Sequence, residues 1–154
     1  MTEVDLDSIE NALGFSLPGF YRRFMVNYPR WLLDKQPPWL QPVTEWDFAD
    51  DAQRVIEFNR LVRAQEPGCF FDDIPWPDEY LVIGNEYDQN YYLVNRLSGG
   101  ETVYRWSHED GQLQTVAGSL PEFRDNLCVW REEWKREFER DNAGPGATPD
   151  RGGS

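Results

Sequence analysis

The sequence predicts a single α+β domain, with a mostly antiparallel sheet of about four to six strands flanked by helices. Apolar residues recur at helical spacing in the first part of the chain, and short β-type runs separated by turn residues follow in the middle. A long amphipathic stretch follows the last run. The 154 residues fit one domain, and a composition of 40% hydrophobic and 15% aromatic residues suffices for a largely aromatic core.

Two short helices are expected at the start of the chain. Asp7 and Glu10 have the spacing of a capping box, which predicts a short helix that stops at Gly14. Pro18 suits the first turn of a second helix, because a proline there loses no hydrogen bond, and Pro29 should end that helix. The apolar face of the second helix consists of Tyr21, Phe24 and Met25.

A proline-rich connection separates these helices from a third one. Residues 31–48 are expected to be mostly extended, with a short strand at 44–48. Asp50 or Asp51 can cap a helix that runs to about Gln65. The apolar stripe of this helix is Val55, Phe58 and Val62.

Four β-type runs follow. The run at 80–83 is continuously apolar, which is typical of a strand covered on both faces and predicts a central position in the sheet. Asp110 and Gly111 are a hairpin signal, because a type I′ turn requires positive φ at both central residues. The strands expected are 80–83, 89–95, 102–107 and 112–117, with a turn at 98–100 between the second and the third.

Ser119 and Glu122 form a second capping box, which should begin the last helix. Its apolar stripe is large enough to require packing against the sheet, although its far end is also suited to a partner or a second copy. The stripe consists of Leu120, Phe123, Leu127, Trp130, Trp134 and Phe138. We expect the domain to span residues 1–140, and the Gly- and Pro-rich residues 141–154 to form a flexible tail.

The charge balance indicates what kind of partner suits the chain. Its 15 basic and 28 acidic residues give a net charge of -13, which disfavours nucleic acid and favours a basic protein surface. The alternative is that the acids serve only solubility. There is neither a membrane-spanning run nor a basic, apolar leader at the start, so we expect a cytoplasmic protein without a membrane partner. Cys69 and Cys128 lie too far apart in sequence to indicate a disulfide framework, and are interpreted as buried free thiols.

No constellation of residues points to catalysis. His108 is the only histidine, and its neighbours Glu109 and Asp110 enter a tight turn, where consecutive side chains diverge. The acidic pairs at 50–51 and 72–73 are more typical of solvated caps and loops than of carboxylate chemistry. Phosphate-binding glycine motifs are missing from the sequence. We therefore expect neither an enzyme nor a cofactor or metal site; the enzyme alternative is a hydrolase using His108 and Asp110.

Acidic residues interleaved with aromatic ones are the distinctive pattern, and this combination suits a protein interface. The opposing interpretation is that Phe71 and Trp76 fill the core while the acids keep the loop soluble. The predicted partner-binding residues are Trp46, Asp47, Asp72, Asp73, Trp76, Asp78, Glu86, Tyr87, Asp88, His108 and Glu109.

Several short motifs, in this order along the chain, resemble the SUKH superfamily. They are Ile9, Glu10 and Leu13-Gly14, then Leu17-Pro18-x-x-Tyr21-x-x-Phe24, Ile83-Gly84, Tyr91-Tyr92-Leu93, Val103-Tyr104-x-Trp106-x-His108-Glu109, and Ser119-Leu120-x-x-Phe123 with Leu127. The chain departs from the family pattern at Asn27-Tyr28-Pro29 and at residues 85–88, where glycine-rich turns are common.

The resemblance implies an α+β fold without catalysis. It also implies an immunity protein that neutralises a cognate toxin by blocking its active cleft or a nearby surface. The alternative is an intracellular regulatory or scaffold module without a toxin partner, as in the fungal members of the superfamily.

Overall fold

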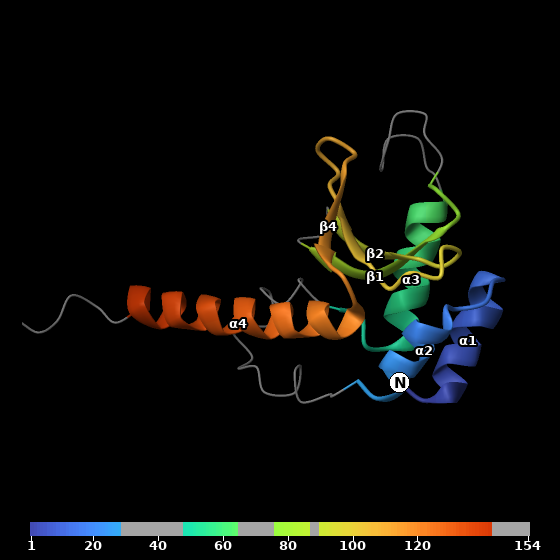
Figure 1. Ribbon diagram of the computed structural model, residues 1–154, viewed down its shortest axis with the longest axis horizontal. Helices are drawn as coiled ribbons and strands as arrows, with labels where there is room; N and C mark the ends of the chain where they lie inside the picture. The colour runs from blue at the N-terminus through green and yellow to red at the C-terminus, as the bar shows by residue number, and fades with distance from the viewer. Residues whose placement is uncertain (29–47, 65–75, 87–89, 143–154) are drawn as a thin grey trace, which may run out of the picture.

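A computed structural model describes residues 1–28, 48–64, 76–86 and 90–142 of the chain. The predicted α+β arrangement is confirmed: an antiparallel sheet is accompanied by helices, and the last helix is long (Figure 1). In chain order the elements are α1 (Glu3–Leu13), α2 (Gly19–Val26), α3 (Ala52–Arg63), β1 (Tyr80–Glu86), β2 (Asn90–Asn95), β3 (Val103–Trp106), β4 (Leu113–Ala117) and α4 (Leu120–Asn142).

The sheet is a simple meander with the order β1-β2-β3-β4, and each strand is antiparallel to the next. One of its faces carries the main core, in which side chains of all four helices meet those of all four strands. The largest fully buried residues of this core are Tyr21, Phe48, Tyr92 and Phe123. Helices therefore cover one face of the sheet, as the apolar stripes predicted.

The opposite face of the sheet carries a smaller, mostly aromatic cluster. Tyr91 and Trp106, on neighbouring strands, stack with their ring centroids 6.0 Å apart. The indole of Trp76 meets Trp106 edge to face at 5.9 Å, and Val62 of α3 completes the cover. Tyr104 lies on the same side of the sheet as Trp106.

The start of α1 differs from the prediction. Its N-cap is Thr2, whose hydroxyl accepts from the backbone N–H of Asp5, while the Asp5 carboxylate accepts from the backbone N–H of Thr2. The predicted box at Asp7 and Glu10 is therefore wrong, and those residues lie inside the helix. The earlier start places Leu6 in the core, where it is fully buried. The predicted end is confirmed, because Gly14 caps the helix in the left-handed conformation with φ 76°.

The other helix starts agree with the sequence. Asp51 caps α3 by accepting from the backbone N–H of Arg54, and Ser119 accepts from that of Glu122 in α4. The Glu122 carboxylate reaches back to the N–H of Gly118 and so completes the cap one residue earlier than a standard box.

The predicted central position of β1 is wrong, because β1 is the first strand of the four. Its outer edge is nevertheless sealed. Asn59 of α3 is fully buried, and its amide both donates to the carbonyl of Val82, at 2.8 Å, and accepts from the N–H of Val82, at 3.0 Å. Arg63 donates to the carbonyl of Tyr80, and Ala49 donates to that of Ile83. An edge strand whose backbone groups are bonded in this way is shielded from solvent as well as a central strand is, which explains the apolar sequence of β1.

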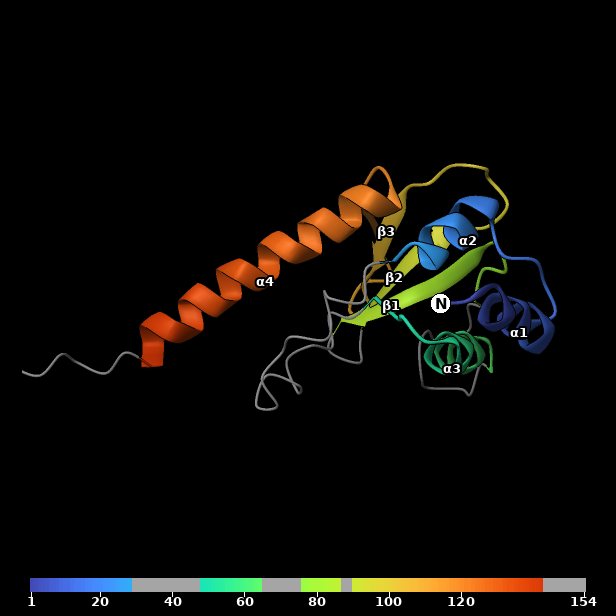
Figure 2. The same cartoon turned by 90° about the horizontal axis from the view of Figure 1, so that it is seen from below.

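The final helix extends past the sheet. Leu120, Phe123 and Leu127 are buried and Trp130 packs against the main core, whereas the C-terminal half runs outward from the sheet (Figure 2). In that half Trp134 and Phe138 stack with their centroids 5.4 Å apart. The predicted packing on the domain's core therefore holds for the N-terminal half of the stripe.

Cys128 of α4 is half-buried rather than buried. The short strand expected at 44–48 falls outside the described residues except for Phe48, which forms an isolated bridge with Gly84. Helix α2 ends at Val26 and α3 at Arg63, shortly before the ends expected at Pro29 and about Gln65. Cys69 and residues 143–154 lie outside the described residues.

Candidate protein-binding surface

Five of the eleven predicted partner-binding residues fall within the described chain: Trp76, Asp78, Glu86, His108 and Glu109. The other six, Trp46, Asp47, Asp72, Asp73, Tyr87 and Asp88, lie outside it. The described five do not form one patch. Glu86, His108 and Glu109 lie at one end of the sheet. Asp78 lies at the opposite end, and Trp76 is buried against the aromatic face.

The end of the sheet where β1 passes into β2 and β3 passes into β4 brings together Glu86 and His108. The Glu86 carboxylate accepts from Nε of Arg105 on β3 and from the amide of Asn90 on β2. The side-chain oxygen Oδ1 of Asn90 in turn accepts from the backbone N–H of His108 at 3.1 Å. This chain of polar contacts fixes the end of β1 and the start of β2 relative to the turn after β3.

A four-residue turn joins β3 to β4 and presents acids to solvent. Ser107 donates its N–H to the carbonyl of Gln112, and Gly111, with φ 67°, donates to the carbonyl of Ser107. The hairpin is confirmed, but its turn is longer than a two-residue type I′ turn. Glu109 and Asp110 are exposed, and neither carboxylate forms an ion pair within the described chain. The turn is therefore an uncompensated negative tip.

Asp78 lies at the opposite end of the sheet, where it is already engaged. Its carboxylate forms an ion pair with Arg96, and Arg63 lies 3.9 Å away. Both guanidinium groups lie over the ring of Phe15. The central guanidinium carbon is 4.9 Å from the ring centroid for Arg63 and 4.5 Å for Arg96. Burial lowers the pKa of Arg63, the nearby Asp78 opposes that shift, and Arg96 adds to it. The cluster joins the loop after α1, the end of α3 and the segments that precede β1 and follow β2.

Trp76 is buried, with 8% of its surface exposed, and its indole N–H donates to the carbonyl of Tyr80. Its ring packs against Tyr91 and Trp106. In this position the side chain supports the aromatic face of the sheet, and it can affect a partner only through the shape of that face.

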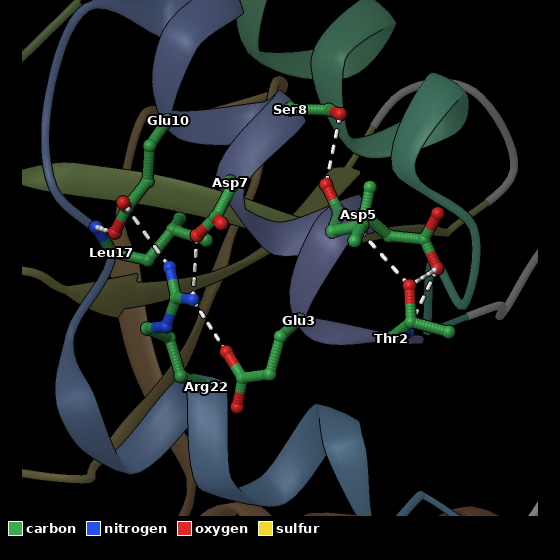
Figure 3. A network of polar contacts seen from close by, with 9 residues as sticks. Thr2, Glu3, Asp5, Asp7, Ser8, Glu10, Leu17 and Arg22 are labelled. Carbon is green, nitrogen blue, oxygen red and sulfur yellow. Dashed lines mark hydrogen bonds and ion pairs between the residues drawn. The ribbon is translucent and has the colours of Figure 1, made fainter.

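A network at the N-terminus was not anticipated from the sequence. Arg22 of α2 forms ion pairs with three carboxylates of α1, those of Glu3, Asp7 and Glu10 (Figure 3). Hydrogen bonds to Asp7 and Glu3 raise the pKa of Arg22. Glu10 also accepts from the backbone N–H of Leu17, so the network fixes the loop between the two helices. The signal in the sequence was the spacing of the three acids, which share one helical face.

His108 was the sequence candidate for catalysis or metal binding. His108 is exposed, and its ring contacts Asn90 rather than a carboxylate. Within the described ranges no group of three or more His, Cys, Asp or Glu side chains is placed to hold a metal ion. Of the helices described, none combines the length and apolar character needed to cross a bilayer.

Comparison with known proteins gives a family. The sequence model of the SMI1 / KNR4 family (SUKH-1) matches residues 1–126, which include every described element up to the first turns of α4. Searches of curated proteins and of solved structures gave no match.

Proposed function

The chain belongs to the SMI1 / KNR4 family (SUKH-1), and from this membership we propose that it is an immunity protein that binds and neutralises a cognate bacterial toxin. The domain acts in the cytoplasm of the cell that makes the toxin, and it works by covering the toxin's active cleft or a nearby surface. The family match carries this proposal, and the absence of a catalytic arrangement in the sequence is consistent with it.

Electrostatics supports a basic partner. The chain has a net charge of -13, and the exposed acids Glu109 and Asp110 lie in the turn between β3 and β4. A toxin that acts on nucleic acid has a basic cleft, because phosphate contacts supply most of its affinity. An acidic tip matches such a cleft and accelerates the encounter at low salt. We therefore place the contact at the end of the sheet that carries Glu86, His108 and Glu109.

The decisive experiment is expression in cells of the gene adjacent to this one, with and without the present chain. Under the proposal the neighbour's product is toxic, co-expression restores growth, and the two proteins purify together. A toxic neighbour that is not relieved by this chain would exclude the immunity role.

A charge-matched pair of variants tests the location of the contact. Glu109→Lys and Glu132→Lys change the net charge equally, but Glu132 lies on the exposed side of α4. We expect Glu109→Lys to slow association with the toxin about tenfold at low salt, and Glu132→Lys to change it less than twofold. Equal effects would mean that overall charge, rather than this end of the sheet, determines binding.

The family name supports one other candidate, an intracellular regulatory or scaffold module that recognises a cellular protein. This role predicts that the chain purifies with a protein whose expression does not harm the cell. The growth test above therefore separates the two roles.

A further inference from the structure

The two outer edges of the sheet are treated differently. Along β1 every outward-facing group from Tyr80 to Gly84 is engaged, through Asn59, Arg63, Trp76 and the bridge between Phe48 and Gly84. Along β4, the one contact of this kind among residues 1–28, 48–64, 76–86 and 90–142 is at its C-terminal end, where Asn126 of α4 donates to the carbonyl of Val116 at 3.3 Å. Within the described part of the chain, the outer edge of β1 is therefore closed from Tyr80 to Gly84, whereas most of the outer edge of β4 is open.

The register shows which backbone groups of β4 face outward. Ser107 and Gln112 form a hydrogen-bonded pair, and pairs alternate along an antiparallel ladder. Gln114, opposite Arg105, therefore points its N–H and C=O toward β3, whereas Leu113 and Thr115 point theirs away from the sheet. Both residues are exposed, Leu113 to 40%. In Figure 1 the hairpin that leads into β4 projects beyond the rest of the sheet.

We propose that the open edge of β4 at Leu113 and Thr115 pairs with an extended, basic segment of the partner protein, which adds a strand to the sheet. Backbone hydrogen bonds supply affinity in this mode, and alternate side chains supply specificity. The bulge at Val116 and the cap by Asn126 end the open stretch, so the added segment is short.

Charge selects a basic segment over a second copy of this chain. The turn that enters β4 carries the uncompensated acids Glu109 and Asp110, directly beside the open backbone groups. Two copies paired through β4 would bring two chains of charge -13 together, and like charges repel. Lysine or arginine side chains on an added strand would instead meet these acids. The inference rests on the proposed function only in requiring a protein partner.

The test uses the whole chain and a short blocked peptide that alternates Lys and Val, observed by amide NMR at low salt. We expect the peptide to shift the Leu113 and Thr115 resonances and to slow exchange of these two amides, while a peptide that alternates Glu and Val does not bind. No binding by the Lys peptide, or shifts confined to another surface, would overturn the proposal. Shifts at Leu113 and Thr115 on raising protein concentration without peptide would assign the edge to a second copy instead.

Matched variants test the hydrogen bonds. Thr115→Pro removes an outward donor but no bond to β3, whereas Thr115→Val keeps the donor. We expect the proline to weaken peptide binding about tenfold and valine to leave it within twofold. Equal binding by both variants would refute strand addition. If Thr115→Pro does not fold, as judged by circular dichroism, Leu113→Lys replaces it, because a lysine on the edge repels the basic peptide and must also weaken binding.

These outcomes are separate from those of the growth test. Loss of rescue by an adjacent toxin leaves the peptide measurement standing, because any basic protein partner can use the edge. Failure of the peptide to bind leaves rescue to occur through a different surface.

Discussion

Replacing Asn59 should be among the most damaging single changes in the protein. In Asn59→Leu the side chain keeps a similar size, but the N–H and C=O of Val82 lose the partner that seals the edge of β1. Asn59 is fully buried, so water does not take its place. Arg63 also loses the Asn59 oxygen, which it contacts at 2.7 Å.

The cost can be worked from these contacts. Each buried group left without a partner costs about 1–3 kcal/mol, and the two groups of Val82 together cost about 4 kcal/mol. Burial of the leucine recovers about 1 kcal/mol. The free energy of unfolding should therefore fall by about 3 kcal/mol, a large part of the 5–15 kcal/mol typical of a domain. With a urea slope of about 2 kcal/mol/M, the unfolding midpoint should fall by about 1.5 M.

Urea unfolding followed by tryptophan fluorescence measures this change. Asn11→Leu, at an exposed position of α1, is the matched control and should shift stability by less than about 0.5 kcal/mol. Hydrogen exchange gives a second readout, because the Val82 amide should lose protection in Asn59→Leu. A loss below about 1 kcal/mol, or an unchanged Val82 amide, would refute the sealed-edge explanation.

Three further changes test other parts of the structure. The buried hydroxyl of Tyr21 has no hydrogen-bond partner in the described chain, so Tyr21→Phe should raise the free energy of unfolding by about 1 kcal/mol in urea unfolding. Burial raises the pKa of Tyr21 in the folded protein above its value in the unfolded chain. Above about pH 10 the phenol therefore ionises in the unfolded chain but not in the folded protein, which lowers the stability of the wild type. The stability advantage of Tyr21→Phe should grow above this pH and not shrink. Arg22→Met should cost about 1 kcal/mol in low-salt thermal melts and less in 1 M salt, whereas the exposed Arg23→Met should cost almost nothing; equal losses would contradict the network. Trp76→Ala should cost about 3–5 kcal/mol in urea unfolding, and an unchanged midpoint would contradict its place in the core.

Local signals allowed much of the fold to be predicted. The end of α1 at Gly14 and the start of α3 at Asp51 depend on caps that act within one helical turn. The strands follow from apolar runs and turn residues. Each of these features can be predicted from a few neighbouring residues. The start of α1 was not readable in this way. Thr2 and Asp5 offer one capping box and Asp7 and Glu10 another, and only the burial of the helix in the core selects between them.

Contacts between distant segments account for the rest. The position of β1 was misjudged because its apolar run reports burial on both faces and does not distinguish a neighbouring strand from a helix that seals the edge. A clue was present in α3, where the polar Asn59 lies on the apolar stripe between Val55 and Val62. A buried asparagine on such a stripe needs backbone partners, and an unpaired strand edge offers them.

The candidate surface was predictable in chemistry but not in layout. Glu86, His108 and Glu109 share one end of the sheet because a meander brings alternate turns together. Asp78 belongs to the other end, which follows from the position of β1 in the order rather than from its acidic neighbours.

The placement of the arginines makes the outward field more negative than an even mixture of the charges would be. The side chains of Arg22, Arg96 and Arg105 are only 23%, 12% and 27% exposed, and each is held by carboxylates of the same chain. Their positive charge is neutralised by ion pairs within the fold, whereas Glu109 and Asp110 are exposed to solvent and form no ion pair in the described chain. Changes at the two kinds of site should therefore separate: losing an internal arginine lowers stability, whereas reversing a tip acid slows partner association and flattens its salt dependence, with stability unchanged. A stopped-flow salt series on Glu109→Lys, beside its thermal melt, would contradict this division if stability fell while the association rate stayed constant.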